Sequence, residues 1–418
     1  MCVKCNRPMV IHVKTAVLTI ETIACAVKYK ILYKKRIEGK MSEKVDVCII
    51  GGGVVGLFCA LEQAQKGKVV RVIDKLYNGS SRYNMGEIVL KGLPESIAEF
   101  AQFSREQWSH AVESFGKNLG YEERAVARFS LEKGHAEILR KAAEVEKAHG
   151  FDVNFIEGHD KVMEVLGTDR ISQDITAVNY SEGEGAIDTA KALDGLRKMI
   201  IQAGVRIWGS DVVEKVEMDA GRITKVVTDT GEECVAENYI IATGVWSGEF
   251  LKKINLSLPI RPARVHILQL IPTGSMPNAI LSSGEKFGNI VIKSQVNGRA
   301  LVMYTASMDP AQATWFTDQD PELIDWLRHQ AGLMVTSLEH AQMRSVNVVT
   351  TAITPDKNPY IGQLEGVENV YIAAGMNGKS YAYAAGAAKF LGALMRGEEH
   401  SFSDETVQAL KPSATRFK

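Results

Sequence analysis

The sequence lacks an excess of charge of either sign, since its 418 residues contain 49 Lys and Arg against 50 Asp and Glu, for a formal net charge of −1. A chain without overall basic character is not expected to bind nucleic acid. Long apolar runs are missing as well. In the Lys-rich first part of the chain, the longest stretch without Lys or Arg extends from Thr15 to Val27 and contains Glu21. That stretch is too short and too interrupted to span a bilayer.

Cysteine is scarce, with six residues in the whole chain. Cys48 and Cys59 fall in a predicted buried strand and in the helix after it, so we expect buried thiols rather than a disulfide framework. This usage suits a reducing cytoplasm. Cys2 and Cys5 form a lone C-x-x-C pair with no second pair nearby, and we predict neither a metal site nor a redox centre from them.

Residues 1–43 differ from the rest of the chain because Lys residues punctuate a segment rich in Val and Ile. A typical cytoplasmic N-terminus begins at Met41, a few residues before the first predicted strand. We therefore expect residues 1–43 to be an extension outside the fold, and the protein to be cytoplasmic. The competing interpretation is an amphipathic anchor, which would hold the protein peripherally at the inner face of a membrane.

The most informative feature that is present is the segment 46–74. The apolar run 47–50 predicts a buried parallel strand. It leads into Gly51-Gly-Gly-Val-Val-Gly56, which fits the pattern G-x-G-x-x-G, and a helical pattern follows. A second strand over 69–73 then ends in Asp74. Because strand, turn, helix, strand and acid all occur at the required spacing, the segment predicts a dinucleotide-binding unit.

Each part of this unit has a physical role. Gly51 allows the tight turn, Gly53 lets the backbone approach a pyrophosphate, and Gly56 lets the helix pack close to the strand. The helix N-terminus offers unpaired N–H groups and the positive end of its dipole to the phosphates. Asp74 is positioned to accept hydrogen bonds from ribose hydroxyl groups.

The remaining pattern alternates strands and helices. Apolar residues at helical spacing predict a helical region over 94–149, and Asp188 is the expected N-cap of a helix over 189–203. Residues 78–86 are rich in Gly and Ser and predict a loop. The other predicted elements are strands at 152–155, 181–187, 205–208, 212–217, 222–229, 233–235, 239–242, 260–271, 288–293, 300–305, 347–351 and 371–374, and helices at 319–340 and 383–396.

Four segments in a constant order resemble the FAD-dependent amine and amino-acid oxidoreductases of the D-amino-acid oxidase, glycine oxidase and sarcosine oxidase superfamily. The first is the glycine-rich unit that ends in Asp74. The others are 239–247, which 258–262 follows as in the family, then 354–362, and finally 370–378. Together they cover about residues 44–398. They are specific for the superfamily and not for one substrate.

The resemblance implies a mixed α/β (α+β) fold with a Rossmann-like FAD-binding domain and a β-rich substrate domain, in which helices flank an antiparallel sheet. The FAD-binding domain is expected to comprise 44–90, 180–255 and 345–400. The substrate domain would comprise 91–179 and 256–344, and residues 401–418 would form a C-terminal tail.

The resemblance also implies FAD as the cofactor. The sequence agrees independently, because it contains no second G-x-G-x-x-G for a nicotinamide. No cysteine follows Cys234, so the cysteinyl flavin bond near the C-terminus of some members is excluded and we expect non-covalent FAD. The implied reaction is oxidation of the C–N bond of an amino acid or secondary amine by hydride transfer to the flavin, after which water hydrolyses the imine.

The expected FAD ligands fall in the family's segments. The turn from Gly375 to Lys379 would place a helix N-terminus beside the N1 and C2=O side of the flavin ring, where negative charge develops on reduction. Trp246 would pack under the ribityl chain or only fill the core. The expected cofactor-binding residues are Gly51, Gly53, Val54, Val55, Gly56, Asp74, Lys75, Ser80, Ser81, Asn84, Gly86, Val213, Thr243, Gly244, Trp246, Gly375, Asn377, Gly378, Lys379 and Ser380.

Four residues are candidates for catalysis. Lys379 would stabilise the reduced ring. Arg264 and His266 alternate on a strand that should border the substrate cavity, although a lone His on a strand is more often structural. Tyr381, with Tyr383, follows the C-terminal turn and would line the cavity.

The chain departs from the family at the substrate carboxylate. Many members carry an Arg three residues before the Thr-Pro-Asp segment, and this chain has Thr351 there. An Arg fork is the natural partner of a carboxylate. Its absence implies either another cation, such as Arg344, Arg264, Arg82 or Lys379, or a substrate that is not a simple α-amino acid.

The expected partner is a small-molecule amino acid or amine. Oxygen, a quinone or a partner subunit would accept the electrons. Two alternatives stay open. One is oxidation of a C–O bond, as in enzymes for 2-hydroxy acids or glycerol phosphate, and the other is a non-catalytic FAD-binding subunit of a heteromeric dehydrogenase.

Overall fold

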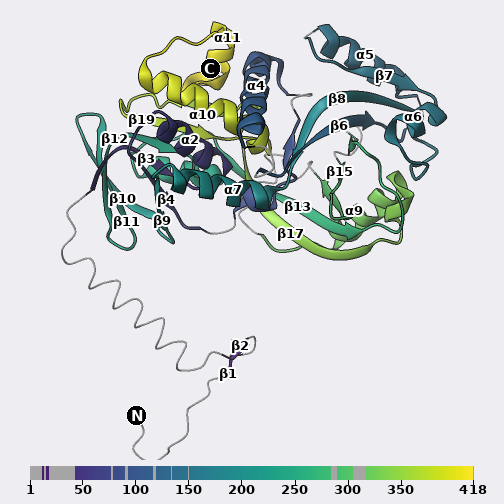
Figure 1. Cartoon of the computed structure of the whole chain (residues 1–418), viewed down its shortest axis with the longest axis horizontal. Coiled ribbons are helices and arrows are strands. Elements are labelled where there is room, and N and C mark those ends of the chain that lie inside the picture. Colours follow the sequence, from purple (N-terminus) through teal and green to yellow (C-terminus); the bar gives the residue numbers. More distant parts are fainter. Residues whose placement is uncertain are drawn as a thin grey trace, which may run out of the picture.

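The computed structural model describes residues 12–13, 16–17, 43–76, 79–89, 93–115, 119–132, 134–148, 150–283, 290–304 and 317–417. The predicted extension 1–43 therefore lies outside the described residues, apart from Glu43 and a short pair of antiparallel strands, β1 (His12–Val13) and β2 (Ala16–Val17). The rest of the chain forms two sheets with helices packed on them, as Figure 1 shows.

The first sheet has a parallel centre built on β3 (Glu43–Ile50), which lies between β4 (Val70–Asp74) and β12 (Glu233–Ile241). Val47 and Ile49 point into one apolar cluster, whereas Cys48 and Ile50 point into another. A strand buried on both faces is expected to be apolar throughout. The other strands of this sheet are β9 (Arg206–Gly209), β10 (Val213–Asp219), β11 (Arg222–Thr228), β18 (Tyr360–Gln363) and β19 (Val370–Ala374).

Four helices share one apolar cluster with this sheet. They are α2 (Val54–Gln65), α4 (Ala98–Phe115), α7 (Thr189–Gln202) and α10 (Ser380–Arg396). The Asp188 side chain caps α7 by accepting from the backbone N–H groups of Ala190 and Lys191, as predicted. On the other face, α8 (Ser247–Lys252) packs with the β10–β12 strands through Phe250 and Leu251.

The second sheet runs in the order β17 (Gln342–Ile353), β13 (Arg261–Ile271), β16 (Ala300–Tyr304), β15 (Ile290–Ser294), β14 (Ile280–Ser282), β6 (Tyr121–Phe129), β8 (Ala177–Ile187) and β5 (Glu87–Ile88), with β7 (Asn154–Glu157) on β8. Nearly all its pairings are antiparallel. Its helices are α5 (Ala136–Ala148), α6 (His159–Leu166) and α9 (Pro321–Met334). The predicted mixed α/β fold with a β-rich second part is thereby confirmed.

The two faces of the second sheet pack against different neighbours. Leu268 and Leu270 of β13 join the cluster that α6 and α9 cover. Val265 and Ile267, one position along, join a smaller cluster with Met85, which belongs to the segment between the two sheets. Because side chains alternate along a strand, β13 has a helix-covered face and a face toward the first sheet.

Several boundaries differ from the sequence prediction. The helical region predicted over 94–149 is wrong in its middle, where residues 121–129 form β6. Its Glu and Arg residues favour a helix on their own, but pairing with β8 on one side and β14 on the other overrides that preference. The loop predicted over 78–86 contains a short helix, α3 (Ser80–Tyr83).

The proposed domain ranges do not coincide with the two sheets. β5, β8 and β17 pair with the second sheet, although the proposed FAD-binding ranges contain much of them. Conversely, α4 packs on the first sheet with α10. The segment 401–418, expected as a tail, contains α11 (Asp404–Leu410) and the 3-10 helix η8 (Ala414–Phe417), and Leu410 is fully buried.

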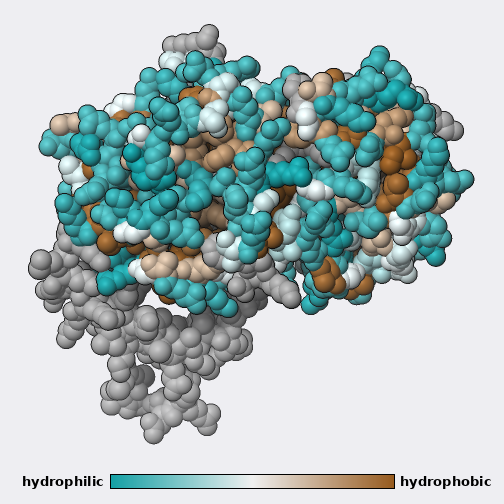
Figure 2. Space-filling model, turned by 45° about the horizontal axis from the view of Figure 1, so that its top comes forward, coloured by the Kyte–Doolittle hydropathy of each residue, from teal (hydrophilic) through white to brown (hydrophobic). Residues whose placement is uncertain are grey.

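The outer surface is mostly hydrophilic on the side that Figure 2 shows, with apolar side chains gathered in separate small groups. Among the described residues, no helix combines the length and the apolar character needed to cross a bilayer.

Candidate active site

A cavity of about 410 Å³ opens where β3, β4 and β12 end. Cavities of this size hold small molecules and cofactors. The carboxyl ends of parallel strands are where ligands bind in open α/β sheets. Ten of the predicted cofactor residues line it: Gly51, Gly53, Asp74, Lys75, Ser80, Ser81, Val213, Thr243, Gly244 and Trp246.

In the glycine-rich turn at this cavity, a side chain larger than that of glycine would come too close to neighbouring atoms. Gly51 has a φ of +108°, and a Cβ there would lie 2.4 Å from the carbonyl oxygen of Ala242. A Cβ at Gly56 would lie 1.9 Å from the carbonyl oxygen of Gly51, so α2 packs directly on the turn. At Gly53 the nearest atom to a Cβ is Ser81 Oγ, at 3.0 Å. Gly53 therefore borders polar groups of the cavity, while Gly51 and Gly56 fit the backbone together.

Asp74 closes the cavity at the end of β4. One carboxylate oxygen accepts from the backbone N–H of Gly52 at 2.6 Å, and the other accepts from Leu76 at 2.7 Å. These bonds orient the carboxylate beside the glycine-rich turn. A carboxylate oxygen has more than one lone pair and can accept from a ribose hydroxyl as well.

The segment 80–86 connects the cavity to the second sheet. Ser81 Oγ accepts from the N–H of Val54, the first residue of α2, at 3.2 Å. At the other end of the segment, the Asn84 side chain donates to the carbonyl oxygen of Gly378 at 3.3 Å. The segment thus links the start of α2 to the turn before α10.

The turn 375–379 contains three residues in the left-handed region of backbone conformation. Gly375, Asn377 and Gly378 have φ values of +66°, +48° and +80°. The Asn377 side chain holds it, since its oxygen accepts from the N–H of Thr354 at 2.9 Å and its amide donates to the carbonyl oxygen of Gly375 at 2.7 Å. Lys379 is the N-cap residue of α10, so the unpaired N–H groups of α10 begin at this turn.

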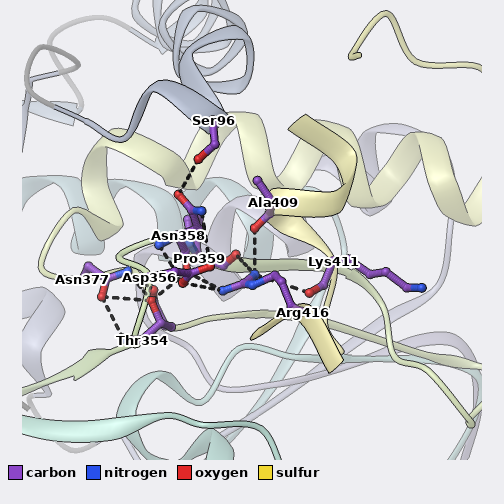
Figure 3. Close-up of polar contacts among 10 residues, drawn as sticks. Ser96, Thr354, Asp356, Asn358, Pro359, Asn377, Ala409, Lys411 and Arg416 are labelled. Carbon is purple, nitrogen blue, oxygen red and sulfur yellow. Dashed lines mark hydrogen bonds and ion pairs between the residues drawn. The ribbon is translucent and has the colours of Figure 1, made fainter. Parts of the chain in front are cut away.

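Arg416 braces the same region from the end of the chain, as Figure 3 shows. Its guanidinium donates to Asp356 Oδ1 at 2.9 Å and to the carbonyl oxygens of Asn358 and Pro359 at 3.0 Å each. The Thr354 hydroxyl donates to the Asn358 carbonyl oxygen at 2.8 Å. Arg416 therefore holds the 354–359 segment on which Asn377 depends.

Two of the predicted catalytic residues lie at this turn. Lys379 Nζ is 3.6 Å from a carboxylate oxygen of Glu87. Tyr381 is fully buried, and its hydroxyl donates to the carbonyl oxygen of Ser81 at 2.8 Å. Burial raises the pKa of Tyr381 far above its ordinary value. Its contacts make Tyr381 a brace between α10 and the 80–86 segment.

The other two predicted catalytic residues point to the helix-covered face of the second sheet. His266 lies on the same side of β13 as Leu268, is 1% exposed, and accepts through Nε2 from the N–H of Asp320 at 3.1 Å. Burial lowers its pKa. Arg264 contacts Asp320 at 3.7 Å. Both residues support the N-terminus of α9 and do not border the face of β13 toward the first sheet.

The other candidate cations are also accounted for. Arg344 is exposed at the point where the β13–β17 register shifts. Arg82 lines the cavity and pairs with Asp194 at 3.3 Å. Thr351 faces Ala263 across β13, at a position with the same parity as Val265. It therefore lies on the face of the sheet that is turned toward the first sheet.

Several polar residues of the cavity were not predicted from the sequence. Arg197, Asp211 and Lys253 line it, together with Gly52 and Leu193. They come from α7, from the connection after β9 and from the residues after α8, where no local pattern marks a ligand. Glu87, which is buried beside Lys379, and Lys293, which is buried and donates to the Met85 carbonyl oxygen, were not predicted either. A charged residue inside an otherwise apolar strand, as in Ile-Val-Ile-Lys293, was the signal available for Lys293.

Comparison with known proteins decides the family. The family described as FAD dependent oxidoreductase matches residues 46–394. The chain belongs to this family. It is 25% identical over 355 residues to a glycine oxidase of Bacillus licheniformis, a match that covers 80% of this chain and 88% of that protein. It is 22% identical over 229 residues to a monomeric sarcosine oxidase of a Bacillus species, covering 54% of this chain and 57% of that protein.

Solved structures share the fold. The glycine oxidase of Geobacillus kaustophilus superimposes with a TM-score of 0.80 at 18% identity, covering 89% of this chain and 99% of that one. The L-proline dehydrogenase of P. horikoshii superimposes with a TM-score of 0.79 at 20% identity, covering 89% and 98%. FAD is accordingly the cofactor of this family member, and the observed turn fits it, since Gly51 and Gly56 allow the turn and α2 to pack together and Gly53 borders the cavity without a side chain.

Proposed function

We propose that this flavoprotein oxidises the C–N bond of an amino acid or secondary amine. When bound, FAD supplies the hydride acceptor, and the protein supplies position and electrostatics. The proposal is carried by the juxtaposition of the 375–379 turn, the start of α10 and the 80–86 segment, where the Asn84 side chain donates to the carbonyl oxygen of Gly378. Non-covalent attachment of FAD is part of the same proposal.

Different residues would bind the cofactor, stabilise its charge and exclude water. Gly51, Gly53 and the N-terminus of α2 would hold the pyrophosphate, and Asp74 the ribose. The α10 N-terminus and Lys379 would favour negative charge at the ring, through the helix dipole and the ammonium group. The apolar face that Val265 and Val349 present would exclude water from the reacting amine.

The substrate carboxylate has fewer candidate partners than the sequence offered. Arg264 points to the other face of the sheet, Arg344 is exposed, and Arg82 already pairs with Asp194. Lys379 is the candidate cation at the turn, and like Arg82 it already has an acidic partner, Glu87 at 3.6 Å. A substrate whose acid group contacts Lys379, or a secondary amine without a simple α-carboxylate, fits this arrangement best.

Anaerobic reduction of the bound flavin tests the proposal. The purified protein would be mixed, without oxygen, with D- and L-amino acids, sarcosine, proline derivatives and opines, while the visible spectrum is followed. Bleaching by one amine class is the expected result, and admitting air or a quinone would then identify the electron acceptor. Bleaching by 2-hydroxy acids or glycerol phosphate would show a C–O substrate instead. A flavin that no compound bleaches would indicate a non-catalytic subunit.

A further inference from the structure

Lys293 is a buried cation on the face of the second sheet turned toward the first. It lies on β15 opposite Leu301 of β16, and Leu301 belongs to the cluster that includes Met85. The residue is 4% exposed. Its ammonium donates to the carbonyl oxygens of Met85 and, at 3.5 Å, Ile187. Both carbonyls belong to segments that cross between the two sheets.

Glu87 follows Met85 by two residues and pairs with Ala186, the neighbour of Ile187, across β5 and β8. Its side chain is 9% exposed, and one carboxylate oxygen is 3.6 Å from Lys379 Nζ. Burial lowers the pKa of Lys293 to about 8, and Glu87 is the strongest of the acidic neighbours that oppose the shift, ahead of Glu122 and Asp188; Arg124 reinforces it. The Glu87 carboxylate is therefore in contact with Lys379 and near enough to Lys293 to oppose the effect of burial on its pKa.

Buried charges are expensive unless they are paired, because the protein interior screens them poorly. The same weak screening lets them act on their surroundings over several ångströms. The cluster of Lys293, Glu87 and Lys379 ends at Lys379, the N-cap residue of α10, where the Lys379 charge adds to the positive end of the helix dipole. Glu87 thus opposes the positive charge that Lys379 and the helix dipole present at the turn.

We propose that Glu87 is a positioning residue that sets the reduction potential of the bound FAD by holding and partly neutralising Lys379, while Lys293 holds the Glu87 end of the cluster. This inference rests on the proposed role of the 375–379 turn at the flavin. It goes beyond that role because it assigns control of the flavin reduction potential to Glu87, which lies outside the glycine-rich turn and the 80–86 segment.

The experiment measures the midpoint potential of bound FAD by reductive titration against reference dyes, which requires no substrate. Glu87→Gln should make the potential more positive, and Lys379→Met should make it more negative. The double variant should fall between the two single variants. Glu62→Gln is the matched control, because Glu62 is also buried and paired with lysine and arginine, at Lys389 and Arg396, but toward the far end of α10.

A potential for Glu87→Gln that matches that of Glu62→Gln would overturn the proposal. If Glu87→Gln fails to retain FAD, Glu87→Asp keeps the charge and withdraws it from Lys379, and a smaller positive shift is expected. No shift in Glu87→Asp would equally overturn the proposal. Failure of the proposed function is distinguishable, since it would appear as a wild-type flavin that dyes reduce and no amine reduces.

Discussion

The hydroxyl of Tyr381 donates to the carbonyl oxygen of Ser81 at 2.8 Å, across 300 positions of sequence. The backbone carbonyl of Tyr381 in turn accepts from the indole N–H of Trp108 at 2.7 Å. One buried tyrosine thereby joins the start of α10, the helix α4 and the segment whose Ser81 side chain caps the glycine-rich turn. In the proposed site, Tyr381 would connect the segment beside the dinucleotide phosphates with the turn beside the flavin ring.

Tyr381→Phe should therefore weaken FAD binding. The ring stays packed, and the Ser81 carbonyl oxygen loses its donor, at a cost of about 1 kcal/mol in stability. We expect an FAD dissociation constant raised by roughly fivefold, in line with that free energy. Fluorescence quenching of FAD titrated with apoprotein measures it. Tyr383→Phe on the same helix is the control, and equal effects of the two variants would show that the Ser81 contact has no special role.

Gly53 and Gly56 should respond differently to alanine. A Cβ at Gly56 would collide with the Gly51 backbone at 1.9 Å, so Gly56→Ala should abolish the folded holoprotein. A Cβ at Gly53 would meet only the Ser81 hydroxyl, at 3.0 Å, so Gly53→Ala should fold and bind FAD more weakly. Circular dichroism and the flavin content of the purified proteins separate the two results. A Gly56→Ala protein with full flavin content would contradict the predicted packing.

His266→Asn should impair stability rather than turnover. His266 accepts from the N–H of Asp320 at the start of α9, and leaving that group poorly bonded costs about 1–3 kcal/mol. Because His266 points away from the face toward the first sheet, the rate of flavin reduction should change less than about threefold, a barrier change under roughly 0.7 kcal/mol. Thermal unfolding and stopped-flow reduction measure the two quantities. A large loss of rate with unchanged stability would restore His266 as a catalytic candidate.

Lys293 should give the protein a characteristic pH dependence of stability. Its pKa is about 8 in the folded chain, against 10.5 for an ordinary lysine. Between these values the unfolded chain binds more protons than the folded chain, so the contribution of Lys293 to the free energy of unfolding rises with pH. From pH 7 to 9.5 the rise should reach about 2 kcal/mol.

The measurement is urea unfolding of the wild type and of Lys293→Met at both pH values. Other groups contribute in this range, among them Cys59, whose pKa burial raises to about 12, but they are common to both proteins and cancel in the comparison. The stability difference should move in favour of the wild type as the pH rises. A difference that is constant with pH would show that Lys293 titrates normally in the folded chain.

Much of the fold could be predicted because the decisive signals are local. A few consecutive residues are enough to recognise each of these features: the glycine-rich turn, the Asp188 cap and the apolar strands β3 and β19. β6 could not be predicted in the same way, since its Glu and Arg residues favour a helix and only pairing with β8 and β14 makes it a strand. Tertiary context overrides propensity there.

In the candidate site, too, residues with a local sequence pattern could be predicted and residues that depend on tertiary structure could not. The residues that carry the family's segments line the cavity or the turn beside it, because glycine positions are dictated by backbone geometry. Whether a catalytic candidate on a strand reaches the site depends on which face of the strand it occupies. A shift of one position along the strand reverses that face. Arg264 and His266 alternate with Val265, so the sequence could identify the strand but not which set of residues faces the first sheet. The Glu87–Lys379 contact joins residues far apart in the chain and has no local pattern.

The brace around Arg416 has a consequence for how the protein is made. A chain growing on a ribosome exposes the glycine-rich turn long before it contains residues 354–379, and it contains those before their anchor at 416. Arg416 reaches Asp356 and the carbonyl oxygens of Asn358 and Pro359 only after residue 416 itself has been synthesised. A polypeptide that stops before residue 416 would therefore contain the glycine-rich turn without the anchor of the 354–359 segment.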